Sequence, residues 1–163
     1  METRTYNVYK IDELPKESKQ KAIEKYYDIN VNWDWWDFTY EDAVQVGLKL
    51  TGFDVERGNY CEGEFINYAS DTARAILKEH GKGCDTYKLA EIYLARCKVI
   101  EAKEETQETE EDCIELEEEF LKDLLECYLL TLKEEFEYNT SEEAILETIR
   151  ANEYDFRSDG TMD

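Results

Sequence analysis

Residues 113–138, with the sequence CIELEEEFLKDLLECYLLTLKEEFEY, decide the fold of this chain. Apolar residues recur there every three or four positions, which places their side chains on one face of an α-helix. The apolar face consists of Phe120, Leu121, Leu124, Leu125, Tyr128, Leu129, Leu132 and Phe136. Acidic residues occupy the opposite side. We therefore predict a long amphipathic helix over residues 113–138.

A second amphipathic helix precedes this one and begins near Asp85, a residue suited to capping. Its apolar side carries Leu89, Ile92, Tyr93, Cys97 and Ile100. Residues 104–112, EETQETEED, lie between the two helices and include no apolar residue. This tract is either a solvated extension of a helix or the loop of a helical hairpin. Antiparallel packing of the two helices buries both apolar faces, so residues 84–138 are predicted to form a protruding acidic helical hairpin.

The remaining chain predicts further short elements. They are a strand at 5–11, a helix after Pro15, a helix at 34–50 ended by Gly52, strands at 53–57 and 62–68, a helix from Ser70 to Gly81, a helix capped by Thr140 and Glu143, and a strand at 154–157. This order predicts an α+β fold, in which helices cover a small antiparallel sheet. We expect one domain over residues 1–163.

Composition limits the classes of partner. A hydrophobic content of 42% supports a core, while the net charge of −22 repels nucleic acid and anionic membranes. Basic protein surfaces and multivalent cations would be attracted instead. The sequence shows no signal peptide and no apolar run long enough to span a membrane, so we expect a soluble protein of the cytoplasm. The five cysteines are scattered, which favours free thiols.

The negative charge is concentrated in residues 101–126, where 13 of 26 residues are Asp or Glu and only Lys103 and Lys122 oppose them. A helix rises about 1.5 Å per residue, which gives one carboxylate for about every 3 Å. A strand of duplex DNA presents one phosphate for about every 3.4 Å. This segment therefore has roughly the charge spacing of a nucleic-acid strand. The alternatives are a solvated helix face and a disordered acidic linker.

The candidate partner-binding residues are the acids of this segment and two tryptophans: Glu104, Glu105, Glu108, Glu110, Glu111, Asp112, Glu115, Glu118, Glu119, Trp33 and Trp35. Adjacent helical residues point about 100° apart, so the tryptophans of residues 33–36 cannot all face inward on one helix. We expect Trp33 or Trp35 to be at least partly exposed. An aromatic cluster at helical spacing is more often part of a core.

The sequence offers little catalytic chemistry. The single histidine, His80, and Cys84 do not form a zinc-binding pattern, and a helix terminus explains His80 better. Asp34, Asp37 and Asp42 form a candidate perturbed carboxylate group, although a capping role is the more common one. We expect no enzyme activity, no metal and no cofactor.

Residues 13–43 and 140–160 resemble the two ends of a family of small acidic proteins encoded by phages and prophages and often labelled antitoxin-like. The C-terminal stretch, with the motif Ala151-Asn152-Glu153-Tyr154-x-Phe156 and the pair Asp159-Gly160, is the more specific one. Residues 61–65, CEGEF, resemble a motif that follows a glycine-rich loop in the family, and the loop is shortened here. The resemblance implies a phage setting and brings no catalytic residue.

These observations predict an anti-defence inhibitor that mimics nucleic acid and binds the basic groove of a host protein, such as a CRISPR effector or a restriction nuclease. One alternative is a sponge that sequesters a nucleotide immune signal, with Arg57, Arg74, Lys78, Lys82 and Arg96 as the candidate cations. Another is an antitoxin-like regulatory protein. We expect a monomer at low salt and at most weak dimers at high salt, through a residual apolar face that has Cys113, Leu116 and Tyr128 at its margin.

Overall fold

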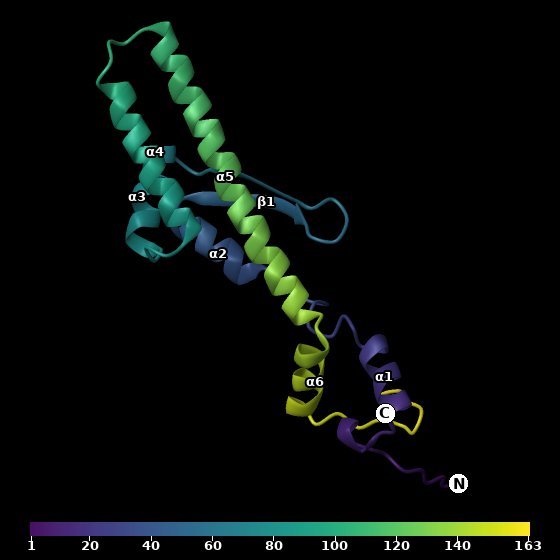
Figure 1. Cartoon of the computed structure of the whole chain (residues 1–163). Helices are drawn as coiled ribbons and strands as arrows, with labels where there is room; N and C mark the ends of the chain where they lie inside the picture. Colours follow the sequence, from purple (N-terminus) through teal and green to yellow (C-terminus); the bar gives the residue numbers. More distant parts are fainter. The chain divides into compact units, whose positions relative to one another are not determined.

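The computed structural model describes all 163 residues, which divide into two compact units. The terminal unit joins both ends of the chain, Met1–Trp35 and Glu134–Asp163, and the middle unit is Trp36–Lys133. Helices and one two-stranded antiparallel sheet make up the fold (Figure 1), which confirms the predicted α+β class. The expectation of a single domain over residues 1–163 stays a prediction.

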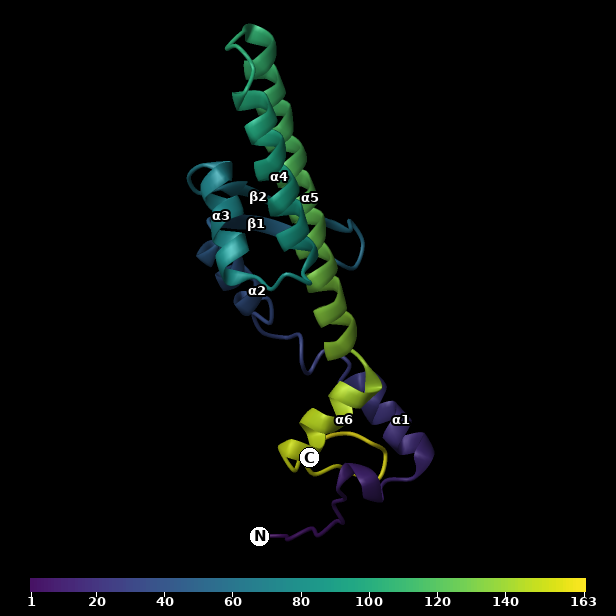
Figure 2. The same ribbon diagram turned by 60° about the vertical axis from the view of Figure 1, so that its left-hand side comes forward.

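The middle unit packs helices on a short β-hairpin. Its elements are α2 (Asp37–Gln45), β1 (Leu48–Asp54), β2 (Tyr60–Phe65), α3 (Ala69–Glu79), α4 (Asp85–Glu101) and the greater part of α5 (Gln107–Asn139). Strand β1 pairs with β2 from Leu48 opposite Phe65 to Asp54 opposite Tyr60. Helices α4 and α5 run antiparallel and side by side (Figure 2), and their connecting loop extends away from the sheet.

The predicted helix over residues 34–50 is too long at both ends. Helix α2 ends at Gln45, and Gly47 then adopts a φ of +85°, a conformation that side chains other than glycine rarely allow. The Gly47 carbonyl accepts hydrogen bonds from the Ile66 amide at 2.8 Å and the Thr72 hydroxyl at 3.2 Å. The helix therefore stops at Gly47 rather than Gly52, and Leu48 starts a strand.

A stack of aromatic rings lies in the core of the middle unit. The Phe120 ring of α5 lies 4.4 Å from the Tyr93 ring of α4 and 5.8 Å from the Phe65 ring of β2, measured between centroids. Phe120 and Tyr93 are buried. These contacts join both helices of the hairpin to the sheet, and aromatic pairs of this kind are worth about 1 kcal/mol beyond their buried area.

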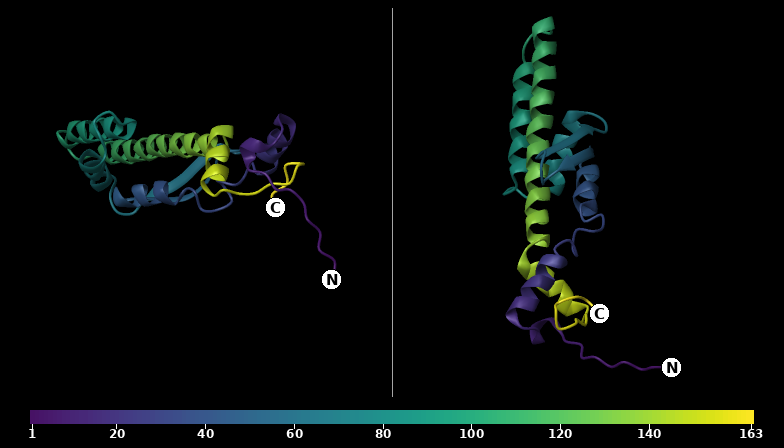
Figure 3. Two further views of the ribbon diagram at one scale, coloured as in Figure 1. Left: turned by 90° about the horizontal axis from the view of Figure 1, so that it is seen from below. Right: turned by 90° about the vertical axis from the view of Figure 1, so that its right-hand side faces the viewer.

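The terminal unit contains a 3₁₀ turn (Ile11–Glu13), α1 (Lys16–Lys25) and α6 (Glu142–Ala151). Figure 3 shows α1 beside the C-terminal segment. The core of this unit is formed by Ile11, Leu14, Ala22, Ile23, Ile145, Leu146, Ile149 and Phe156. Helix α6 is capped by the Ser141 hydroxyl, which accepts a hydrogen bond from the Ala144 amide, so the predicted cap at Thr140 is one residue early.

The two strands predicted near the chain ends are wrong. Neither 5–11 nor 154–157 forms a strand: Ile11 begins the 3₁₀ turn, and Phe156 forms only single bridges, to Tyr9 and to Met162. Tyr9 and Phe156 exchange two backbone hydrogen bonds of 2.8 Å. Alternating polar and apolar residues need a neighbouring strand to form a sheet, and here each pairing ends after one residue.

Candidate acidic interface

The predicted acidic tract at residues 104–112 is partly loop and partly helix. Helix α4 ends at Glu101, and α5 begins at Gln107, six residues before the predicted start at Cys113. Glu104 and Glu105 therefore lie in the connecting loop. The acids from Glu108 onward lie on a regular helix.

A pair of threonines fixes this early start. The Thr106 amide donates to the Thr109 hydroxyl at 2.9 Å, and the Thr109 amide donates to the Thr106 hydroxyl at 3.3 Å. This reciprocal capping satisfies two of the amide donors that a helix N-terminus leaves unpaired. Carboxylates in the first turn, Glu108 and Glu110 among them, interact favourably with the helix dipole. The acidic sequence thus suits the position that it occupies.

The acids of this segment face solvent. Exposed side chains are those of Glu104, Glu105, Glu108, Glu110, Glu111, Glu115, Glu118 and Glu119, and Asp112 is half-buried. Leu116, Phe120 and Leu124 of the same helix are buried in the core. The hydrophobic face therefore holds the helix in place, and the carboxylates keep a fixed spacing along it.

Few of these carboxylates are neutralised within the chain. Of the acids in residues 101–126, Glu119 alone forms an ion pair, with Arg96 of α4 at 3.0 Å. Both partners are about half-exposed, so the pair is weak. Asp123 has a pKa above its ordinary value because of burial and the nearby Glu126 and Glu119 carboxylates. The hairpin therefore carries a concentrated and largely uncompensated negative charge.

The two candidate tryptophans differ in exposure. The Trp33 side chain is 54% exposed, whereas Trp35 is 4% exposed and its ring centroid lies 5.7 Å from that of Phe136. Trp33 is therefore the accessible one of the two. Both belong to the terminal unit, and the acids of α5 up to Glu126 belong to the middle unit. A role for either tryptophan in binding stays a prediction.

The structure also assembles a polar cluster that sequence reasoning missed. The His80 Nδ1 atom lies 2.7 Å from the Thr86 hydroxyl, and the Tyr128 hydroxyl donates to the Asp42 carboxylate at 2.9 Å. The His80 Nε2 atom is 3.2 Å from that same carboxylate but forms no hydrogen bond. Burial, followed by the nearby Asp42, raises the Tyr128 pKa above its ordinary value. This cluster joins α2, α4 and α5 to the end of α3.

Two predicted features of the surface change in the structure. Leu116 and Tyr128, expected at the margin of a dimer interface, are buried within the middle unit. Asp34 and Asp37 are exposed and separate from the polar cluster that contains Asp42.

No group of His, Cys, Asp and Glu side chains in the chain has an arrangement that could hold a metal ion. All five cysteines are free thiols. None of the helices has both the length and the apolar character needed to cross a membrane. No protein-family model, no curated protein and no solved structure matches the chain.

Proposed function

We propose that this chain is a non-catalytic inhibitor that binds the basic nucleic-acid-binding groove of a host protein, by presenting the carboxylates of α5 in place of phosphates. The observation that carries the proposal is the exposed and largely uncompensated run of acids in the first part of helix α5. A CRISPR effector or a restriction nuclease is the kind of target that fits, in the phage setting that the resemblance of the two chain ends implies.

The physical basis is charge spacing on a fixed scaffold. Ten of the twenty residues at 107–126 are acidic, and a helix rises about 1.5 Å per residue, so this part of α5 carries a carboxylate for about every 3 Å. Binding then resembles nucleic-acid binding in two respects. It is fast, because the fields of the partners attract at long range, and salt weakens it, because exposed charges are screened within about 8–10 Å at physiological ionic strength.

The test uses charge reversal with a matched control. Glu110, Glu111, Glu115 and Glu118 are changed to Lys in one variant, and the exposed Glu41, Glu56, Glu79 and Glu137 are changed to Lys in the other. The tagged proteins are mixed with a bacterial lysate at low salt, and bound nucleic-acid-binding proteins are eluted with duplex DNA. We expect the wild type and the control to retain such proteins and the α5 variant to lose them. Equal retention by both variants, or retention that salt does not weaken, would refute the proposal.

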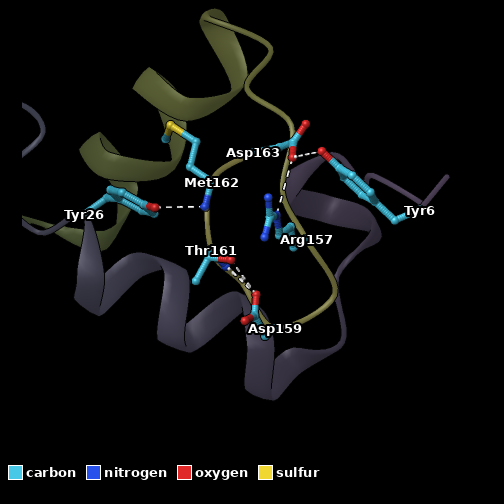
Figure 4. A network of polar contacts seen from close by, with 7 residues as sticks. All are labelled: Tyr6, Tyr26, Arg157, Asp159, Thr161, Met162 and Asp163. Carbon is cyan, nitrogen blue, oxygen red and sulfur yellow. Dashed lines mark hydrogen bonds and ion pairs between the residues drawn. The ribbon is translucent and has the colours of Figure 1, made fainter. Parts of the chain in front are cut away.

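A second candidate is the sponge for a nucleotide signal, and one pocket in the terminal unit favours it. This pocket of about 470 Å³ is lined by Tyr6, Tyr9 and Arg157, a combination suited to stacking a base and pairing with phosphate. The Arg157 guanidinium lies 5.2 Å from the Tyr6 ring, but it also contacts the Asp163 carboxylate at 3.5 Å (Figure 4). That carboxylate would have to move before a phosphate could bind.

Of the cations proposed for this role from the sequence, Arg74 and Arg96 are in ion pairs with Asp71 and Glu119. Calorimetry with cyclic nucleotides tests the sponge directly, with Arg157→Gln as the variant that should lose binding. The absence of heat from the wild type would exclude this function.

A further inference from the structure

An apolar groove lies beside the acidic face, where the β-hairpin meets helix α5. It has a volume of about 380 Å³ and is lined by Tyr60 and Cys61 of the hairpin and by Leu121, Leu125 and Leu129 of α5. Pockets of this size accept side chains or small ligands. The groove is therefore a candidate for contact with another molecule.

Strand β2 passes close to α5 at Gly63, next to Leu125 of the groove. A Cβ atom on Gly63 would lie 3.1 Å from Leu125 Cδ2 and 2.7 Å from the Lys49 carbonyl oxygen. Phe120 and Leu124 of α5 are buried, whereas the leucines on the flank of the helix remain half-buried. Tyr60 is 45% exposed. Leu121, Leu125 and Leu129, spaced four residues apart along α5, therefore remain partly exposed to solvent.

The charges around the groove define its occupant. Glu118 and Glu126 border the leucines, with Lys122 between them, and the acids of α5 continue from the same helix. A row of leucines at this spacing matches an amphipathic helix that lies in the groove, a common mode of peptide recognition. In a protein of net charge −22, such a helix binds best when its polar face carries Lys or Arg.

We infer that the groove binds an amphipathic helix whose apolar side chains contact Tyr60, Leu121, Leu125 and Leu129 and whose basic side chains face Glu118 and Glu126. This inference rests on the proposed function, because the helix would belong to the same basic partner. The groove adds an apolar anchor to a surface that otherwise acts through charge. Interfaces usually obtain most of their affinity from a few such buried anchors.

The first experiment measures binding of a fluorescent amphipathic peptide of Leu and Lys to the full chain by anisotropy. A peptide of the same composition with its leucines scattered around the helix serves as the control ligand. The groove variant combines Tyr60→Ser and Leu129→Ser. The matched variant combines Tyr68→Ser and Leu130→Ser, which removes the same residue types from exposed positions outside the groove.

We expect the amphipathic peptide to bind the wild type and the matched variant alike, and the groove variant at least about fivefold more weakly. The scattered peptide should bind all three proteins weakly. If both peptides bound both variants equally, the groove would not be the binding site of the helix. The proposed charge-based function would be unaffected by that result. Failure of both peptides to bind the wild type at low salt would overturn the groove and count against the proposed function as well.

A second experiment locates the peptide without a mutation. Cys61 lines the groove, and burial, together with the nearby Glu62, raises the pKa of its thiol to about 11. Cys84 is exposed and lies outside the groove. Mass spectrometry of the alkylated protein gives the modification rate of each thiol. Bound peptide should slow the reaction of Cys61 and leave that of Cys84 unchanged, and an unchanged rate at Cys61 under saturating peptide would overturn the inference.

The other possible occupant is a second copy of this chain. Two chains of net charge −22 repel each other within a Debye length, so we expect a monomer in low-salt buffer. Light scattering distinguishes the two cases. A stable dimer of the wild type that becomes a monomer in the groove variant would assign the groove to self-association and overturn the binding of a basic helix.

Discussion

Thr106 and Thr109 cap each other at the start of helix α5, since each backbone amide donates to the hydroxyl of the other residue. Thr109 is buried, and its hydroxyl also donates to the Thr106 carbonyl at 2.8 Å. This pair therefore determines where the acidic segment becomes helical.

Changing Thr109 to Ala should loosen the first turns of α5, because two hydrogen bonds of the cap lose their partner. We expect a loss of about 1 kcal/mol in the free energy of unfolding. Hydrogen exchange should be faster at the amides of residues 107–112. Thr131→Ala is the control, since the Thr131 hydroxyl donates to the Cys127 carbonyl within the same helix and caps nothing. Equal exchange at residues 107–112 in both variants would contradict the capping role.

Changing Tyr128 to Phe tests the polar cluster of the middle unit. The substitution removes the donor to the Asp42 carboxylate and keeps the buried ring, so we expect the free energy of unfolding to fall by about 1 kcal/mol. Urea denaturation measures the change. Tyr68→Phe alters a tyrosine that is 75% exposed and should have no effect. If the two variants are equally stable, the hydrogen bond to Asp42 contributes nothing.

Changing Gly160 to Ala should destabilise the terminal unit. Gly160 has a φ of +88°, and a Cβ atom there would overlap the Ser18 carbonyl oxygen. Hydrogen bonds fix the loop around Gly160 (Figure 4). The Asp159 carboxylate accepts hydrogen bonds from the amide and the hydroxyl of Thr161, and the Met162 amide donates a hydrogen bond to the Tyr26 hydroxyl. We expect a loss of about 2 kcal/mol or more in the free energy of unfolding.

Gly83→Ala is the control for Gly160→Ala, because a Cβ atom at Gly83 would meet nothing within 4 Å. Thermal melting followed by circular dichroism compares the two variants with the wild type. If the Gly160→Ala and Gly83→Ala variants had the same melting temperature, the C-terminal loop would be able to shift and accept the methyl group.

The ion pairs of Asp12 should make stability depend on pH. Hydrogen bonds from Arg150, at 2.8 and 2.7 Å, and from Lys19, at 3.0 Å, hold the pKa of Asp12 well below its ordinary value. Folding therefore favours the ionised carboxylate. The stabilisation is fully present above the ordinary pKa of an aspartate, about 4, and is lost as the pH falls through the lower pKa of the folded state.

Asp12→Asn should thus melt below the wild type at neutral pH, and the two melting temperatures should converge in strong acid. The difference should be small, because the side chain is half-exposed and water screens the pair. Asp34→Asn, at an exposed position of the same unit, should match the wild type throughout. A difference between Asp12→Asn and the wild type that is constant over the whole pH range would rule out the ion pairs as its cause.

The sequence predicts the helices well where a long apolar face repeats. The face of α5 around Phe120 and Leu124 is buried as expected. A β-hairpin forms, but its strands at 48–54 and 60–65 begin five and two residues earlier than the predicted strands at 53–57 and 62–68. The ends of elements were less predictable. The sequence predicts Gly52 as the helix stop, but the helix ends before Gly47, whose carbonyl accepts a hydrogen bond from Thr72, 25 residues away.

In the candidate site, too, some features follow from the local sequence and others depend on contacts between distant residues. The acids of α5 could be found from composition alone, because a dense run of carboxylates cannot be buried. The sequence predicts the start of α5 at Cys113, six residues too late, because the capping residues Thr106 and Thr109 lie in a tract without apolar residues. The meeting of Asp42, His80 and Tyr128 depends on how four helices pack, and no local pattern in the sequence indicates it.

The terminal unit is assembled from residues at opposite ends of the polypeptide, and this has a consequence for synthesis on the ribosome. Tyr9 cannot pair with Phe156 until the ribosome has added the 146 residues between them and Phe156 itself, which takes roughly ten seconds or more at bacterial elongation rates. During that time Ile11, Ile23 and Trp35 lack the partners that later bury them. The middle unit, whose residues emerge together, has all its own contacts available earlier, so the nascent chain completes its centre before its ends.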